Sequence, residues 1–143
     1  MTGDSSRGLP GDAPSTWLVR LLAAVFVGLG FLFILAPRAG ASLFGLPAPE
    51  GEGFGYLPAI GLRDLAFGFY LLILSFTATR RALGLIFAAT AIIPIGDVII
   101  VAAERGSEAG FNLLLHGLSA AAMAAASLWL LAQASHDTTG GPS

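Results

Sequence analysis

The feature that most constrains this chain is a series of four long apolar runs, separated by short connections. A helix that crosses a bilayer needs about 20 mainly apolar residues, since each residue adds about 1.5 Å to its length. Lipid also leaves backbone polar groups no water to bond, so only helices or closed barrels can span it. The runs predict four membrane-crossing helices, at about residues 17–36, 57–79, 82–103 and 111–134.

The composition agrees with a membrane location and excludes several functions. The 143 residues are 55% hydrophobic and 11% charged, with a mean hydropathy of +0.81. Soluble domains carry about 25% charged residues. The net charge is -2 and there is no lysine, so a basic surface for nucleic acid is not expected. The absence of cysteine excludes disulfides, thiolate metal sites and thiol catalysis.

We predict an all-α fold, a four-transmembrane-helix up-down bundle over residues 17–134. The polar segments 1–16 and 135–143 are expected to be disordered tails. The connection 37–56 is rich in Gly and Pro, which predicts a loop that lies on the membrane surface or caps the bundle. Pro94 falls inside the third run and predicts a kink in the turn before it.

The arginines predict how the bundle is oriented. Those on the side that holds both termini are Arg7, Arg20, Arg80 and Arg81. Because short cytoplasmic loops carry an excess of basic residues, we predict a multi-pass protein of the cell membrane with both termini in the cytoplasm. An alternative for the first run is a cleaved signal peptide, since residues 39–41 have the small-x-small form of a cleavage site. The run is longer than the apolar region of most signal peptides.

Ionisable side chains interrupt three of the four runs at similar depths. Arg63 and Asp64 lie roughly 10 Å inside the second span, and Asp97 lies about 9 Å from the same face, because successive helices run in opposite directions. His116 is a little over one turn into the fourth span, with Asn112 one turn shallower on the same stripe. Charged groups in lipid are costly and usually face the protein interior, so these residues are functional candidates.

The shared depth has a structural and a functional interpretation. In the structural one, Arg63 pairs with Asp97 or Asp64, His116 bonds the remaining carboxylate, and the cluster holds three helices together. In the functional one, the cluster is a site for a lipophilic small molecule. Carboxylates beside an arginine can supply both acid and base, and an imidazole can relay protons near neutral pH. The predicted catalytic residues are Arg63, Asp64, Asp97 and His116. The predicted ligand-binding residues are Tyr56, Gly61, Phe67 and Asn112.

Other chemistries are less favoured. One membrane histidine and two aspartates are fewer ligands than a two-His facial triad needs, so no metal site is predicted, and His116 alone does not indicate haem. The sequence leaves the cofactor unknown. Proton-coupled transport is the least favoured function, because the first span has no carboxylate at mid-membrane depth. The expected partners are the lipid bilayer, a lipophilic small molecule and a second copy of the chain, and no nucleic acid.

Three motifs together resemble one known family. They are Gly-x-Arg-Asp-Leu-x-x-Gly at residues 61–68, Pro-x-x-Asp at residues 94–97, and a histidine early in the fourth run. This layout resembles the small four-helix integral membrane family catalogued as domain of unknown function 4267, and is similar in architecture to DoxX-like membrane proteins. The resemblance covers about residues 17–134. It implies the fold, the membrane location and a shared polar set of Arg63, Asp64, Asp97 and His116.

The resemblance does not imply an activity, because that family has no agreed one. Some small four-helix membrane proteins of similar layout act on lipophilic polyketides or terpenoids. By analogy, an acid–base isomerase, a cyclase or a quinone-linked enzyme is the activity to consider first. The alternative is a non-catalytic accessory or assembly subunit, in which the polar cluster only joins helices.

Overall fold

The computed structural model describes residues 9, 11 and 13–139, and in this part of the chain every regular element is a helix. The all-α prediction is therefore confirmed for the described residues. The elements in chain order are α1 (Pro14–Leu35), α2 (Pro37–Phe44), the 3₁₀ turn η1 (Gly51–Gly55), α3 (Tyr56–Thr77), α4 (Arg80–Thr90), α5 (Ile92–Arg105), the 3₁₀ turn η2 (Gly106–Ala109) and α6 (Gly110–Thr139). Of the tails predicted as disordered, residues 1–8, 10, 12 and 140–143 lie outside the described residues, whereas residues 14–16 and 135–139 are helical.

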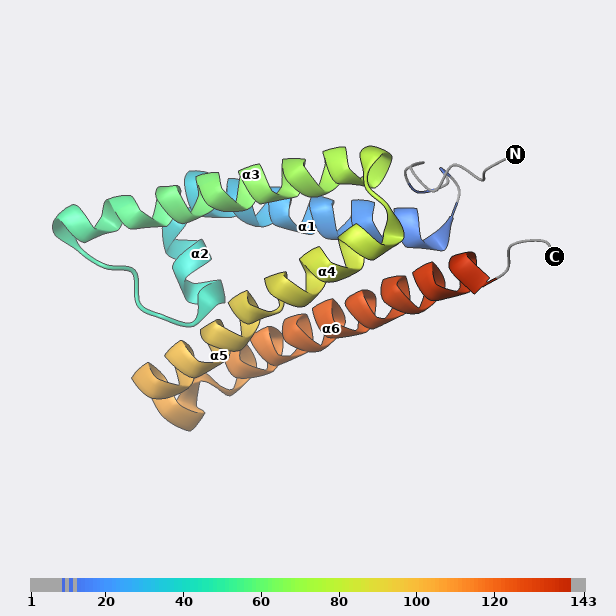
Figure 1. Ribbon diagram of the computed structural model, residues 1–143. Coiled ribbons are helices and arrows are strands. Elements are labelled where there is room, and N and C mark those ends of the chain that lie inside the picture. Colours follow the sequence, from blue (N-terminus) through green and yellow to red (C-terminus); the bar gives the residue numbers. More distant parts are fainter. Residues whose placement is uncertain (1–8, 10, 12, 140–143) are drawn as a thin grey trace.

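Three helical segments are long and apolar enough to cross a membrane. They are Pro14–Leu35, Gly51–Thr77 and Arg80–His136. The third segment reverses direction at η2, since α4 and α5 both pack along α6 (Figure 1). The long helices therefore form two antiparallel hairpins, one of α1 and α3 and the other of α4–α5 and α6.

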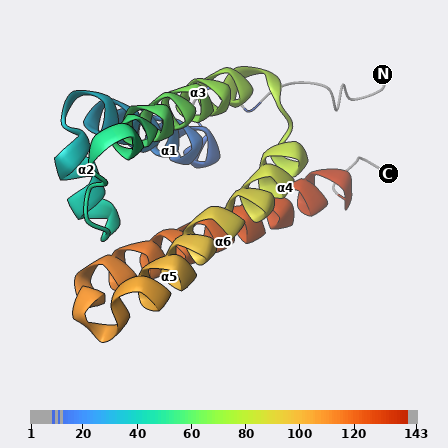
Figure 2. The ribbon, with the colours of Figure 1, turned by 90° about the vertical axis from the view of Figure 1, so that its left-hand side faces the viewer.

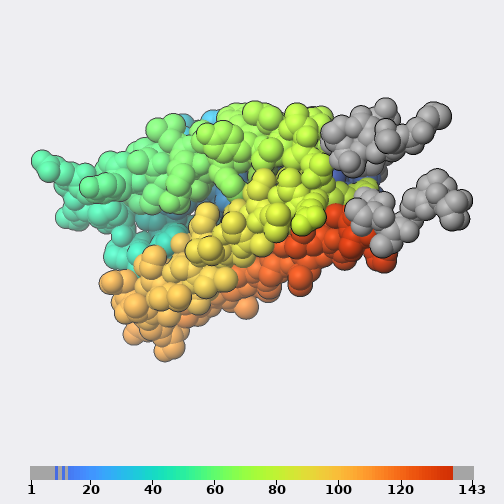
Figure 3. Space-filling view, viewed as in Figure 1, coloured from blue at the N-terminus to red at the C-terminus, as the bar shows by residue number. Residues whose placement is uncertain are grey.

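The two hairpins meet at one end of the molecule and diverge toward the other. They are close together where α1 begins and α6 ends, and α2 lies in the opening at the far end (Figures 1 and 2). The space-filling view shows the teal atoms of α2 between green α3 and orange α5 (Figure 3). The protein is therefore a helical bundle, but a splayed one in which a short helix fills the gap.

Each end of the bundle has its own apolar core. The larger core joins both hairpins, and its buried residues include Val19 and Ala23 of α1, Leu71 of α3, Leu83 and Phe87 of α4, and Met123 and Leu130 of α6. The smaller core contains Phe33, Ala41 and Leu57, which belong to α1, α2 and α3. Apolar packing therefore fixes α2 to the first hairpin, and the second hairpin contributes nothing to the smaller core.

Glycines allow α1 and α3 to approach closely. A Cβ atom added to Gly61 would lie 2.6 Å from the carbonyl oxygen of Gly30, and one added to Gly68 would lie 2.9 Å from that of Ala23. Both distances are too short for a real side chain, so the helix crossing depends on these positions being glycine. Gly28, by contrast, faces open space.

The third predicted span divides into α4 and α5 at Ala91, in the turn before Pro94 where a kink was predicted, because Pro94 cannot donate to the carbonyl one turn earlier. Two other predictions of local structure are corrected. The predicted loop 37–56 contains α2, which begins with Pro37 and ends at Gly45, where φ is +104°. The last helix reaches Thr139 instead of 134, since no Gly or Pro interrupts the chain before residue 140.

Candidate functional site

Three of the four predicted catalytic residues gather at the diverging end of the bundle. Asp64 comes from α3, Asp97 from α5 and His116 from α6. Their side chains are largely covered, with 15% of Asp64, 22% of Asp97 and 11% of His116 exposed. Asp64 of the first hairpin lies near enough to Asp97 of the second for their carboxyl groups to interact electrostatically. Two carboxylates and an imidazole, from both hairpins, are thus brought into electrostatic range.

His116 is held from both ring nitrogens. Its Nε2 lies 2.8 Å from the carbonyl oxygen of Phe44, and its Nδ1 lies 3.6 Å from Oδ2 of Asp97. A carbonyl oxygen can only accept, so Nε2 must carry a hydrogen and donate it. Nδ1 is left to face the carboxyl group, at ion-pair distance rather than hydrogen-bond distance. One further proton can therefore reside on either Nδ1 or Asp97, which is the arrangement of an acid–base pair.

The fourth predicted residue, Arg63, does not point into this cluster. Its side chain is 66% exposed, and its Nε lies 3.7 Å from Oδ1 of the adjacent Asp64. Its charge reaches Asp97, but no direct contact joins those two side chains among the described residues. Adjacent positions on a helix point about 100° apart, so when Asp64 faces inward Arg63 cannot. Of the two predicted Arg63 pairings, the structure therefore has the one with Asp64.

Asn112 and Arg105 bind the end of α2 together with His116. Nδ2 of Asn112 donates to the carbonyl oxygens of Ser42, at 3.1 Å, and Leu43, at 2.8 Å. Nη1 of Arg105 donates to the carbonyl oxygen of Gly45, at 3.2 Å. With the bond from His116 to Phe44, four consecutive carbonyls receive side-chain donors. The last carbonyls of a helix have no partner within it, so these three residues cap α2 from the other hairpin.

The remaining predicted ligand-binding residues lie elsewhere. Tyr56 is 73% exposed and lines a shallow open pocket with Glu52 and Ala59. Phe67 packs edge-on against Phe26 of α1, with ring centres 4.7 Å apart. The space beside the Cα atom of Gly61 is occupied by α1, so Gly61 lines no cavity. In the described structure these three residues do not contact the cluster of Asp64, Asp97 and His116. Phe67 and Gly61 face α1, and Tyr56 faces the outside of the protein.

Sequence reasoning missed α2 and the role of its carbonyls. Proline is favoured at the first position of a helix and glycine just after its end, and Pro37 and Gly45 have this spacing. That pattern could have identified the helix. It could not have shown that Arg105 and Asn112 reach it, since those residues are 60 to 70 positions away in sequence.

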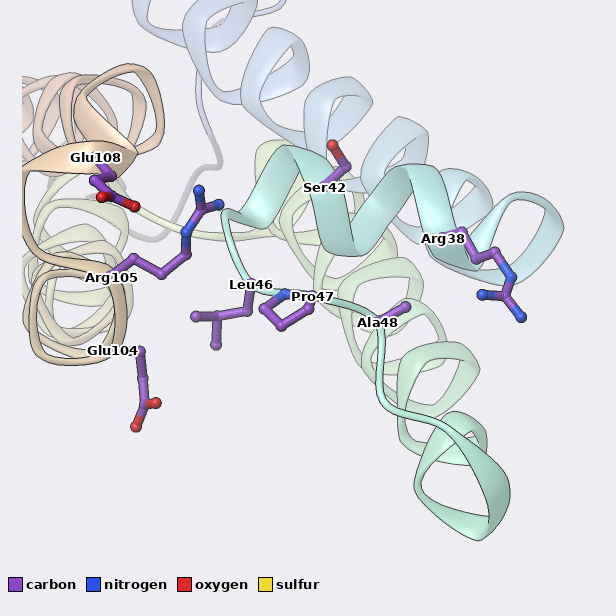
Figure 4. Close-up of a pocket in the computed structure, with 8 residues that line it drawn as sticks. All are labelled: Arg38, Ser42, Leu46, Pro47, Ala48, Glu104, Arg105 and Glu108. Atoms are coloured by element: carbon purple, nitrogen blue, oxygen red, sulfur yellow. The ribbon is translucent and has the colours of Figure 1, made fainter.

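An open pocket of about 690 Å³ lies on the outer side of the same junction (Figure 4). Its lining residues are Arg38, Ser42, Leu46, Pro47, Ala48, Glu104, Arg105 and Glu108. Arg105 points to the end of α2, whereas Arg38 points away from it (Figure 4). This pocket and His116 thus both lie at the end of α2, the pocket beside Ser42 and Leu46 and the imidazole at the carbonyl of Phe44. Among the described residues, no group of three or more His, Asp or Glu side chains is placed to hold a metal ion.

The fold and the buried polar cluster define a class of protein. Helices apolar and long enough to cross a membrane, with ionisable groups turned toward one another, are those of a multi-pass helical membrane protein. More specifically, residues 23–130 match the family described as Domain of unknown function (DUF4267), and the chain belongs to that family. The resemblance drawn from the motifs is therefore confirmed. Neither a curated protein nor a solved structure matches this chain. The similarity to DoxX-like proteins stays a prediction.

Proposed function

We propose that this protein is an integral membrane protein that binds or converts a lipophilic small molecule at the cluster of Asp64, Asp97 and His116. The observation that carries this proposal is the imidazole of His116, whose Nε2 donates to Phe44 while its Nδ1 faces Asp97. A histidine needed only to join α2 and α6 would be satisfied by the first of these contacts. The second contact sets an imidazole nitrogen 3.6 Å from a carboxylate oxygen inside the bundle, which supports a role in proton transfer.

The ligand is proposed to approach from lipid, through the gap between the two hairpins. Four passes of the chain, by α1, α3, α4–α5 and α6, would surround that gap, with the cluster nearer the face opposite both termini. Asp64 belongs to the first hairpin, and Asp97 and His116 belong to the second. A ligand lying there would meet carboxyl groups on both sides, which is what proton donation at one atom and removal at another require. Isomerisation, cyclisation or proton exchange on a quinone-type ring are reactions of this kind.

Arg63 has a lesser role in this proposal than the sequence suggested. Its exposed guanidinium lies beside Asp64, with Nε 3.7 Å from Oδ1 of that carboxylate. It would act on the ligand only through Asp64, as a positioning residue. Asn112 likewise belongs to the scaffold, since its Nδ2 donates to two backbone carbonyls of α2.

The experiment is to purify the full-length protein in native lipid discs and identify co-purified lipophilic compounds by mass spectrometry. The wild type should carry a compound that is absent from discs of an unrelated membrane protein. Asp64→Asn and Asp97→Asn remove a carboxylate but keep its size, and each should reduce the bound compound at least tenfold. Glu104→Gln is the matched control, because its exposed carboxylate lies outside the cluster, and it should retain the compound. No enriched compound in wild-type discs would contradict the proposal.

An accessory or assembly subunit is the second candidate, and the capping of α2 favours it. Three side chains of the second hairpin bind α2, so the polar layer also joins the two hairpins. If joining is its only role, Asp97→Asn should lower the thermal unfolding temperature in discs without changing any co-purified compound. The same set of purified variants therefore separates the two functions.

A further inference from the structure

The two hairpins are connected differently at the two ends of the molecule. At the end where α1 begins, α1, α3, α4 and α6 share one continuous apolar core. At the other end, the apolar contacts of α2 are with α1 and α3, through Phe33, Ala41 and Leu57. A Cβ atom added to Gly40 would come within 2.8 Å of the Phe33 ring, so α2 sits directly on α1. The first hairpin and α2 therefore form one packed unit at this end.

Among the described residues, the side-chain hydrogen bonds from the second hairpin to this unit go to the end of α2. They are the bonds of Arg105, Asn112 and His116 to the carbonyl oxygens of residues 42–45. Hydrogen bonds to a helix end can be exchanged for bonds to water or to another donor without any loss of apolar burial. A closely packed apolar interface offers no such exchange, because separating it loses the van der Waals contacts that hold membrane helices together.

The backbone on both sides of α2 departs from regular helix. Ala36, between α1 and α2, has φ of -136° and ψ of 61°. Gly45 follows α2 with φ of +104°, and Gly51 in the next connection has φ of +60°. Residues of this kind at element ends are where hinge movements are usually absorbed.

The end of α2 also covers the polar cluster. The ring of Phe44 lies edge-on to the His116 imidazole, with ring centres 5.1 Å apart, and its carbonyl takes the imidazole hydrogen. Asn112 fills the space beside Gly45, where an added Cβ would lie 2.7 Å from that of Asn112. Movement of α2 away from α6 would therefore uncover His116 and open the gap beside Asp97.

We propose that α2 is a lid over the gap between the hairpins, closed by a polar latch in which Arg105, Asn112 and His116 bind its last four carbonyls. The proposal rests on the proposed function for its purpose, since the lid would control access of the lipophilic molecule to the cluster. The latch residue His116 also belongs to the cluster. A ligand that engages this imidazole therefore competes directly with the bond that keeps the lid closed.

The lid is tested by measuring the distance from α2 to α6 with pairs of spin labels. The chain has no cysteine, so labels can be placed at will. Ala39→Cys on α2 and Leu118→Cys on α6, both exposed, report on the lid. Leu85→Cys on α4 and Leu128→Cys on α6, also exposed, report on the second hairpin as a reference. Double electron–electron resonance is recorded for the full-length protein in lipid discs.

Replacing the latch by Asn112→Leu with His116→Leu should shift the lid distance outward by about 5 Å, roughly one helical turn, and broaden it. The reference distance should stay unchanged, which shows that the variant is folded. Gly45→Ala disturbs the latch from the side of α2 and should have the same effect while both α6 side chains remain. An unchanged lid distance in a variant with an intact reference distance would overturn the lid. This result is independent of whether any compound co-purifies, so the lid and the proposed function can fail separately.

Discussion

At the scale of single residues, small side chains decide where helices touch. The α1–α3 contact depends on glycines whose Cα atoms face the backbone of the other helix. The α4–α6 contact has a glycine too, since a Cβ on Gly84 would lie 2.8 Å from the Leu131 side chain. In lipid, where apolar surface has no water to leave, such close packing supplies much of the energy that joins helices.

Gly61→Ala should therefore destabilise the protein by about 1–3 kcal/mol, the usual cost of overpacking. The added methyl would meet the carbonyl oxygen of Gly30 at 2.6 Å, and backbone cannot move aside as a flexible side chain can. Gly28→Ala is the control, because nothing lies within 4 Å of its Cβ, and it should change stability by less than about 0.5 kcal/mol. Reversible unfolding in mixed micelles measures both. Equal effects would contradict this account of the helix crossing.

A single hydrogen bond from Ser127 also joins α6 to α4. Its Oγ donates to the carbonyl oxygen of Gly84 at 2.8 Å, from α6 to α4, and the bond is buried. Ser127→Ala should lower stability by about 0.6–1.7 kcal/mol, the range for bonds between membrane helices. In Ser119 the hydroxyl bonds back to Leu115 of its own helix, in an exposed position. Ser119→Ala should thus leave the unfolding curve in place, and a comparable loss there would show that the interhelical bond is not the cause.

At the scale of elements, most helix boundaries follow from local chemistry. Thr79 caps the start of α4 with its side chain, since its Oγ1 accepts from the backbone N–H of Ala82 at 3.2 Å. Proline begins both α1 and α2, where its missing N–H costs nothing. The break at Ala91 separates α4 from α5 one turn before Pro94. This break lies between the apolar half of the third span and the half that carries Asp97.

Thr79→Ala should loosen the first turn of α4, because it removes an acceptor from an otherwise unpaired N–H group. The expected loss is about 0.5–2 kcal/mol, with faster hydrogen exchange at residues 80–82. Thr77→Ala is a nearby control, since its hydroxyl only returns to the carbonyl of Ile73 in α3. Unchanged exchange in Thr79→Ala would mean that packing of α4 on α6 alone holds this turn.

At the scale of the whole molecule, charge is distributed unequally between the two ends. Arg20, Arg80 and Arg81 lie near the end where α1 begins and α6 ends. The guanidinium of Arg20 lies over the rings of Trp17 and Phe76, at 5.5 and 4.7 Å, as expected for a group at a membrane interface. Near the other end, Arg38 and Arg105 are accompanied by four glutamates, which are Glu50, Glu52, Glu104 and Glu108.

This distribution leads us to expect cytoplasmic termini and four passes, which labelling of single cysteines in intact cells can test. Ser107→Cys in η2 should react with a membrane-impermeant maleimide from outside. Ser135→Cys near the end of α6 should react only after the cells are permeabilised. The physical reason is that short loops with arginine stay in the cytoplasm. Labelling of both positions from the same side would mean that α4–α5 and α6 do not each cross the membrane.

Much of the site was predictable residue by residue, but not its geometry. Rare ionisable residues in apolar runs point to Asp64, Asp97 and His116, because lipid makes any other placement costly. The same logic could not separate Asp64 from Arg63, since adjacent residues are equally deep. Only the packing of α3 against α1 decides which of them turns inward and which stays 66% exposed.

The amino-acid sequence by itself determined that this chain forms apolar helices of membrane-spanning length, interrupted near Pro94, because helix formation and length depend on residues close together in the chain. The tertiary structure alone decided that the hairpins splay, that α2 fills the gap, and that Asn112 and His116 bind its end. Those contacts join residues 69 to 72 positions apart. They depend on how the two hairpins and α2 are arranged in space, which no pattern of neighbouring residues encodes.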